Sequence, residues 1–333
     1  MMYSNSKFDE SKQSDAVNDD TGAVKTMYEY APYPDLGANL KDPSDYIKHI
    51  QGEMAGRKNI CFLEAGCGTG HHLVGTAKRY PDWKCSGIDL SSASLEIARQ
   101  LAANHSVNVD VHQGSYLDKL PFEEKSFDVI SAMGTIHHCS DPVGAINNLA
   151  KYMKDDGWMF MHMYGMRCDQ KKFDIKEMLS IFEPDLTKYE KRFSFYNAYI
   201  KHQKKDWVRY LANLSMMDVY HIIKKKIYDW KRKKAGITWS PAFTEKFDEP
   251  NSPWIDHFCH PCERAYEVRD LQDTIEKSDL EVVFMLGQGR EDFRFMPPEW
   301  MLEYQRLSPW DKWRLNELLA PGDSSFRMIL KKK

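Results

Sequence analysis

Short apolar or alternating runs recur along the first half of the chain, and segments with helical periodicity separate them. The runs predict strands at residues 60–63, 83–91, 107–111, 126–130 and 157–164. Helical spacing is clear after Ser91, where Leu95, Ala98 and Leu101 share one face, and it returns in the helix that carries Ile146. Strands that alternate with helices predict an α/β fold with a largely parallel sheet.

A glycine-rich turn follows the first predicted strand. Glycines 66, 68 and 70 lie between the strand and a predicted helix from His71. Without a Cβ, a glycine backbone lets a nucleotide-like ligand approach, and the helix start offers free N–H groups. The spacing is not the G-x-x-G step of a dinucleotide site. Glu64, just before the turn, would repel a pyrophosphate but suits a cationic ligand.

An acidic residue ends the second predicted strand. Asp89 lies nineteen positions after Gly70, close to the spacing of about 20 residues at which a carboxylate binds the ribose hydroxyls of a nucleoside. The same side chain is also a favoured N-cap for the helix that follows. The two roles are compatible.

With these motifs in this order, residues 24–165 resemble the class I S-adenosylmethionine-dependent methyltransferases of small-molecule type, whose signature is an acid followed by G-x-G-x-G. The resemblance implies S-adenosylmethionine as cofactor and S-adenosylhomocysteine as product. It also implies a set of cofactor-binding positions: Tyr28, Glu64, Gly66, Cys67, Gly68, Gly70, Asp89, Leu90, Ser115, Tyr116, Met133 and Gly134. Ser115 departs from the acid that the family often has there, so its hydroxyl or the backbone would meet the adenine.

The same resemblance implies a Rossmann-like sheet of seven strands in the order 3-2-1-4-5-7-6, completed by strands at 281–286 and 325–330. The implied organisation divides the chain into five parts. These are a disordered tail (1–20), a lid and helix (21–57), the cofactor-binding core (58–165), a helical insertion that shapes the acceptor site (166–265) and the C-terminal completion of the sheet (266–333). A smaller helical insertion is expected at 290–320.

Methyl transfer to a hydroxyl or an ammonium needs a base to remove a proton. The double histidine after the fourth strand is frequent in the family, and the resemblance makes His137 the first candidate for this base. His162 and Tyr164, at the end of the fifth strand, come next. The expected acceptor is a small molecule, and its identity, its reacting atom and the oligomeric state stay open.

The aromatic segment around Tyr28 precedes two prolines that favour an extended path. In similar methyltransferases such a segment folds over the cofactor, which makes Tyr28 a candidate lid residue. Packing against the outside of the sheet is the alternative.

The net charge of −3 offers no general attraction to nucleic acid. Residues 188–234 are nonetheless basic and aromatic. A solvated helix explains this pattern, and two alternatives stay open. Residues 201–234 could contact a membrane surface, or the segment could bind a protein, lipid or RNA acceptor. A base-modifying enzyme would carry an Asn- or Asp-Pro-Pro-aromatic run after the fourth strand, where this chain has Met133–Ile136. A non-catalytic S-adenosylmethionine-binding module and a nicotinamide-dependent oxidoreductase are further alternatives.

The segment from Asp256 to Glu263 holds four soft metal ligands, His257, Cys259, His260 and Cys262. No second Cys/His pair stands at finger spacing, so we expect no metal and interpret the segment as a turn that lines the pocket. Seven scattered cysteines, a polar N-terminus and the lack of an apolar run of about 20 residues favour a cytoplasmic protein without a membrane span.

Overall fold

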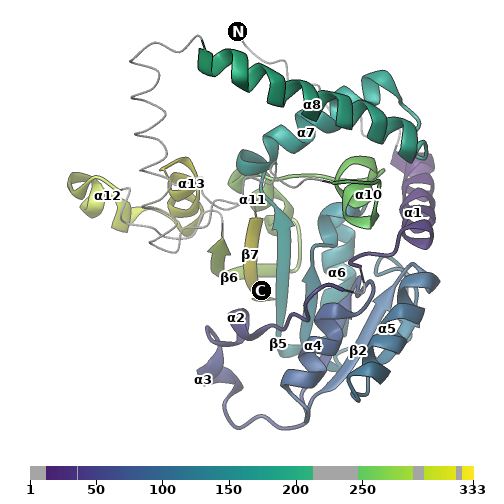
Figure 1. Cartoon of the computed structure of the whole chain (residues 1–333). Coiled ribbons are helices and arrows are strands. Elements are labelled where there is room, and N and C mark those ends of the chain that lie inside the picture. The colour runs from purple at the N-terminus through teal and green to yellow at the C-terminus, as the bar shows by residue number, and fades with distance from the viewer. Residues whose placement is uncertain (1–12, 36, 213–246, 288–295, 320–324) are drawn as a thin grey trace.

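The computed structural model describes residues 13–35, 37–212, 247–287, 296–319 and 325–333. A seven-stranded sheet in the order β3-β2-β1-β4-β5-β7-β6 forms its centre (Figure 1). All neighbouring strands are parallel except β7, which is antiparallel to both β5 and β6. The predicted order and Rossmann-like class are therefore confirmed. The strands are β1 (Cys61–Ala65), β2 (Lys84–Asp89), β3 (Asp110–Gln113), β4 (Phe127–Met133), β5 (Met153–Tyr164), β6 (Leu280–Gly287) and β7 (Ser325–Lys332).

Helices cover both faces of the sheet and one of its ends. Those that connect or precede the strands are α2 (Ser44–Ile47), α3 (Gln51–Met54), α4 (His71–Arg79), α5 (Ser92–Asn104), the short η2 (Ile136–His138), α6 (Pro142–Tyr152) and α11 (Val268–Glu276). The remaining described helices are α1 (Gln13–Tyr30), α7 (Met166–Phe182), α8 (Tyr189–Ala212), α10 (Ser252–Cys259), η4 (Pro298–Trp300), α12 (Met301–Arg306) and α13 (Pro309–Leu319). No helix among the described residues is both long and apolar enough to span a membrane.

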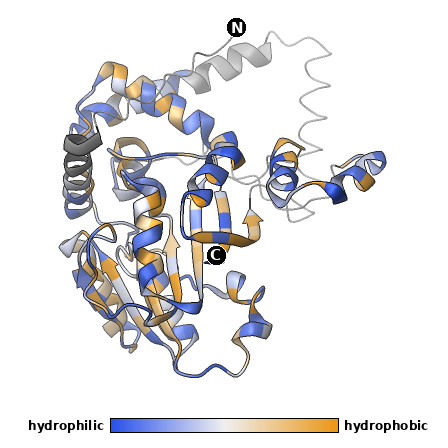
Figure 2. Ribbon diagram, turned by 180° about the vertical axis from the view of Figure 1, so that it is seen from behind, coloured by the Kyte–Doolittle hydropathy of each residue, from blue (hydrophilic) through white to orange (hydrophobic). Residues whose placement is uncertain are grey.

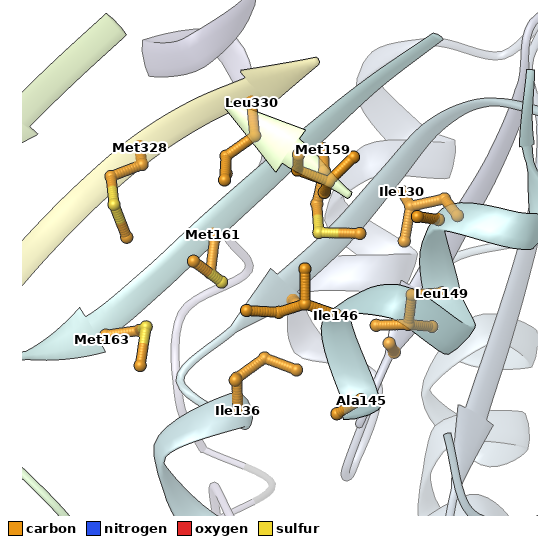
Figure 3. Packing of buried hydrophobic residues seen from close by; sticks show 14 of the residues in the cluster. Ile130, Ile136, Ala145, Ile146, Leu149, Met159, Met161, Met163, Met328 and Leu330 are labelled. Carbon is orange, nitrogen blue, oxygen red and sulfur yellow. The ribbon is translucent and has the colours of Figure 1, made fainter. Parts of the chain in front are cut away.

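The central strands bury side chains on both faces, because side chains alternate along a strand and helices cover each side. On β5, Met159, Met161 and Met163 enter the core beneath α6 and α11, as Figure 3 shows for the α6 side. Trp158 and Phe160 point the other way, toward α4 and α2. Figure 2 shows the resulting contrast between largely orange central strands and helices on which blue and orange alternate.

A third cluster of buried side chains lies outside the sheet. It joins α1, α7, α8 and α10, which we call the helical cap, and Figure 1 shows these helices together above and beside one end of the strands. Trp254 of α10 is fully buried there among Leu179 of α7 and Phe193 of α8. The Arg192 guanidinium of α8 donates a hydrogen bond to the Phe258 carbonyl of α10 at 3.0 Å. The buried apolar side chains of the described helices within 166–265 thus pack on one another and on α1, in a cluster that includes no strand residue.

Several element boundaries differ from the sequence prediction. Helix α1 begins at Gln13, within the stretch assigned to the N-terminal tail, and residues 1–12 lie outside the described part. The third strand begins at Asp110 instead of position 107. The fifth strand begins at Met153, which pairs with Phe127, instead of position 157. Ser91, not Asp89, caps α5, accepting a hydrogen bond from Ser94 N.

Candidate functional site

The glycine turn is held tightly between β1 and its neighbours. Gly68 has φ of +51°, and a Cβ built there would lie 2.6 Å from the Tyr33 carbonyl oxygen. Gly70 has φ of +82°, and its Cβ would meet the Ala98 Cβ of α5 at 2.7 Å. Both positions therefore require glycine for the backbone conformation and for close packing. Gly66, Cys67 and Gly68 of the turn line the space above β1.

Asp89 braces this turn from the end of β2. Its Oδ2 accepts a hydrogen bond from Gly68 N at 2.8 Å, and its Oδ1 accepts one from Ser91 N at 2.9 Å. Burial raises the pKa of this carboxyl, although the two N–H groups oppose the shift. Each carboxylate oxygen has further acceptor capacity. The pair of oxygens can therefore accept from two neighbouring ribose hydroxyls while it keeps the turn in place.

Glu64 places a second carboxylate beside the turn. It is 3% exposed, and its Oε1 lies 3.1 Å from His72 Nδ1. Its Oε2 is buried and has no hydrogen-bond partner within the described structure. A buried carboxylate oxygen without a partner is costly unless a donor or a cation meets it. The methionine ammonium of S-adenosylmethionine is a group of that kind.

A cavity of about 580 Å³ opens at the carboxyl ends of the parallel strands, where open α/β sheets bind ligands. Nearly all the residues that the sequence analysis assigned to the cofactor or to catalysis line this cavity. They are Tyr28, Glu64, Gly66, Cys67, Gly68, Asp89, Leu90, Ser115, Tyr116, Met133, Gly134, His162 and Tyr164.

Two assigned residues do not line the cavity. Gly70 is the N-terminal cap of α4 and packs against α5, so its part in the site is to shape the turn. His137 is 0% exposed and lies behind Tyr164, with ring centroids 3.9 Å apart. The His137 imidazole does not reach the cavity, because η2 turns it inward and presents the next residue, His138, instead. This placement argues against His137 as the base.

The structure adds cavity residues that the sequence analysis did not assign to the site. His138 is one, and Tyr33, Lys41 and Thr135 are others. Asp256 also lines the cavity, from helix α10 rather than from the turn expected there. The double histidine and the Asp256 segment were visible in the sequence. Their contact with the same cavity depends on how the cap folds back over β4 and β5.

The N-terminal helix α1 closes one side of the cavity through Tyr28. The Tyr28 hydroxyl donates a hydrogen bond to Asp256 Oδ1 at 2.7 Å, and burial together with this carboxylate raises the pKa of Tyr28. The next residue, Glu29, accepts hydrogen bonds from Ser92 N at 2.7 Å and Ala93 N at 3.1 Å at the start of α5. A carboxylate at a helix N-terminus is favourable. Tyr28 therefore faces the cavity from a helix anchored on α5, not from the outside of the sheet.

Three ion-pair partners tie the cap to the strand end below Tyr164. Glu263 contacts Lys172 at 2.7 Å and Lys176 at 3.0 Å, with its side chain 0% exposed. Lys172 Nζ in turn lies 4.2 Å from the centre of the Tyr164 ring. A buried carboxylate between two ammonium groups is well compensated. This arrangement fixes Tyr164 against α7.

Histidines concentrate at the same end of the cavity. Burial lowers the pKa values of His138 and His260 and lowers that of His162 to about 4. These imidazoles are therefore neutral near pH 7. A neutral imidazole accepts a proton through one nitrogen while the other donates.

His138, Asp256 and His260 form a potential metal-ligand group, with ligand atoms within 4.8 Å of one another. The two imidazoles are stacked, with centroids 3.9 Å apart and planes at 22°. A tetrahedral zinc lies in the plane of each imidazole and separates two such ring centres by about 5 Å. The His260 Nδ1 also accepts a hydrogen bond from Cys262 N at 3.2 Å, which places the ring proton on Nε2. This geometry does not suit a shared metal.

Of the four soft ligands named from the sequence, only His260 belongs to that group. Cys259 is buried in the helical cap, and the His257 Nδ1 lies 2.7 Å from the Pro253 carbonyl oxygen. The backbone N–H of Cys262 donates its hydrogen bond to His260 Nδ1. The four side chains are therefore not gathered around one point.

Fold and site together define a Rossmann-like protein with a nucleoside site and a carboxylate suited to a cationic ligand. Comparison with known proteins agrees. Residues 62–157 match a family model described as a methyltransferase domain. An uncharacterised protein of Synechococcus is 26% identical over 93% of this chain and 71% of that protein. A ubiquinone biosynthesis O-methyltransferase of Alkalilimnicola ehrlichii is 31% identical over 34% of this chain, and a malonyl-[acyl-carrier protein] O-methyltransferase of Ilyobacter polytropus is 26% identical over 49% of it.

The chain spans 44% of the length of the first of these O-methyltransferases and 57% of the second. The solved structure of PKMT2 from Rickettsia typhi has the same fold, with a TM-score of 0.58, 16% identity, and 86% of this chain and 52% of that one covered. PKMT2 has also been solved in complex with AdoHcy, the product of the cofactor. The chain thus contains a class I S-adenosylmethionine-dependent methyltransferase domain, with S-adenosylmethionine as its cofactor.

Proposed function

We propose that this protein transfers the methyl group of S-adenosylmethionine to a small-molecule acceptor held in the same cavity. The observation that supports this most directly is the composition of the cavity wall. The lining includes the glycine turn with Glu64 and Asp89, and it also includes Tyr28 and Asp256 from the helical cap. A cavity with both kinds of wall can hold a cofactor and an acceptor together.

The chemistry asks little of the protein beyond alignment and exclusion of water. The sulfonium of bound S-adenosylmethionine supplies an already activated methyl group. Asp89 would bind the ribose, Glu64 the methionine ammonium, and Ser115 and Tyr116 the adenine side. Among the catalytic candidates, His162 and Tyr164 face the cavity, whereas His137 lies behind it.

We also propose that residues 166–265 serve as the acceptor-shaping insertion, with residues 58–165 as the cofactor core and 266–333 as its completion. The described cap helices support this division, because they share a core that excludes the sheet. Residues 213–246, which carry most of the basic segment 201–234, lie outside the described part of the chain. The membrane, protein and RNA alternatives for that segment therefore have no support from the described contacts.

Two named relatives are O-methyltransferases, yet their matched stretches amount to about half of their lengths. The matched family model likewise ends at residue 157, before the helical cap. Their names therefore support methyl transfer and leave the acceptor atom open. The free cysteines Cys61, Cys67, Cys85, Cys139, Cys259 and Cys262 support a reducing compartment such as the cytoplasm.

The test is a labelling experiment. Purified protein is incubated with methyl-labelled S-adenosylmethionine and a host extract, beside an Asp89→Ala control that weakens cofactor binding. Label in the small-molecule fraction, absent from the control, is the expected result. Label in precipitable protein or RNA would refute the proposed acceptor class, and no label despite measured cofactor binding would refute catalysis.

A further inference from the structure

The cavity carries an excess of negative charge. Among the described residues that line it, three carboxylates, Glu64, Asp89 and Asp256, stand against one lysine, Lys41. The histidines of the wall with resolved shifts, His138 and His162, have lowered pKa values and do not balance this charge near pH 7. Ligands that enter must therefore bring positive charge or many hydrogen-bond donors.

The cofactor accounts for only part of this excess. S-adenosylmethionine carries a sulfonium, an ammonium and a carboxylate, which amounts to one net positive charge. Glu64, with its unpartnered buried oxygen, suits the ammonium. Asp89, braced by two backbone N–H groups, suits the ribose. Neither part of the cofactor accounts for Asp256 of α10.

Asp256 is a buried carboxylate without a cation. It is 3% exposed, and its contact on the cavity side is the neutral Tyr28 hydroxyl at 2.7 Å. No lysine, arginine or histidine nitrogen of the described residues forms an ion pair with it within 4.0 Å. By contrast, the nearby buried Glu263 has two lysines. A buried carboxylate that the fold leaves uncompensated is the natural partner of a cationic ligand.

We propose that the methyl acceptor is an amine, bound as an ammonium ion against Asp256 and methylated on nitrogen. This inference rests on the proposed methyltransferase function and names its substrate class. A neutral hydroxyl acceptor would leave the charge of Asp256 uncompensated. An ammonium compensates it.

An ammonium must lose a proton before its nitrogen can attack, and His138 is placed to take that proton. The His138 Nδ1 lies 3.2 Å from the Cys262 carbonyl oxygen, so this nitrogen carries the ring hydrogen and donates it. The Nε2 then holds a free lone pair. His138 and Asp256 have ligand atoms within 4.8 Å of each other. One nitrogen can bridge this separation, because two hydrogen bonds of about 2.9 Å that meet at its tetrahedral angle span about 4.7 Å.

The proposed step balances. One ammonium proton passes to His138 Nε2, and the amine nitrogen forms a bond to the methyl carbon. The carbon–sulfur bond breaks, and its electron pair stays on sulfur in S-adenosylhomocysteine. Asp256 holds the nitrogen, which remains cationic after it gains the methyl group.

The experiment uses the labelled products of the full-length protein acting on a host small-molecule extract. A cation-exchange resin at pH 7 retains amines, and mass spectra of the retained fraction locate the methyl group. We expect N-methyl products on the resin. Asp256→Asn keeps the shape and the Tyr28 contact and should reduce this labelling at least tenfold, with the dissociation constant of S-adenosylhomocysteine changed less than twofold. Asp82→Asn, at an exposed turn before β2, is the matched control.

A second variant keeps the proposal testable if Asp256→Asn fails to fold. His138→Gln cannot accept the proton and should lower kcat at least tenfold while KM for the labelled amine stays within threefold. Label in ethers, or in esters that release methanol in base, would overturn the amine assignment while leaving methyl transfer intact. Undiminished labelling by Asp256→Asn, or weakened cofactor binding by it, would overturn the role of Asp256. Absence of any label with cofactor bound would instead refute the proposed function itself.

Discussion

Acid should destabilise this fold through its buried neutral histidines, and His162 allows the effect to be worked out. Burial, followed by nearby Arg327 and Lys41, lowers the pKa of His162 to about 4, against about 6.5 for an unfolded chain. Between these values the unfolded state binds more protons than the folded state. The contribution of His162 to the free energy of unfolding is therefore fully present above pH 6.5 and falls as the pH drops toward 4.

The magnitude follows from the shift. At about 1.4 kcal/mol per pH unit, lowering the pH from 6.5 to 5 removes at most about 2 kcal/mol through His162. Water in the cavity that His162 lines reduces this figure. His137, His138 and His260 act in the same direction, because burial lowers their pKa values too.

The assay is urea unfolding at pH 7.5 and pH 5, followed by tryptophan fluorescence. Wild-type protein should lose more unfolding free energy between these conditions than His162→Gln, by up to about 2 kcal/mol. His202→Gln, at an exposed position on α8, controls for the loss of a histidine as such. Identical pH dependence in wild type and His162→Gln would show that the reasoning from burial is wrong.

Three further perturbations test the cofactor half of the site and its lid. Asp89→Ala should weaken S-adenosylhomocysteine binding at least tenfold, about 1.4 kcal/mol, by calorimetric titration; an unchanged dissociation constant would remove Asp89 from the ribose site. Glu64→Gln keeps the shape of the side chain but removes its charge, so it should weaken the binding of S-adenosylhomocysteine. The dissociation constant of 5′-methylthioadenosine, which lacks the ammonium, should change less than twofold. Equal losses of affinity for both ligands would contradict a contact with the ammonium. Glu29→Gln removes the carboxylate at the start of α5, so it should lower the free energy of unfolding by about 0.5 kcal/mol and speed proteolysis within α1. Unchanged cleavage would mean that other contacts hold α1 in place.

The sheet could be predicted because its signals are local. Buried parallel strands appear as short apolar runs, and the glycine turn fixes which strand begins the nucleoside site. The order of the strands came from the family resemblance, and the structure confirms it. The misplaced start of β5 has a local cause, because Met153 is apolar and fits the helical spacing of α6 as well as a strand.

The acceptor side could not be predicted in the same way. His137 and His138 are adjacent, and only the turn of η2 decides which imidazole reaches the cavity. Tyr28 and Asp256 are 228 positions apart, and no sequence periodicity links residues at that separation. The start of α1 carries no apolar periodicity, because residues 13–20 are mostly polar. Its continuation buries Val24 and Met27, and the chain directly after it buries Ala31.

The two walls of the cavity therefore come from parts of the chain with different constraints. The cofactor wall is built into the strand ends, where Gly68 and Asp89 are also required for the fold. The proposed acceptor wall comes from the helical cap, whose core is separate from the sheet. We therefore expect a change at Asp256 to alter the choice of acceptor without disturbing cofactor binding. The matched methyltransferase model stops at residue 157, so on this proposal the residues that select the acceptor lie mainly in the part of the chain for which that model carries no information.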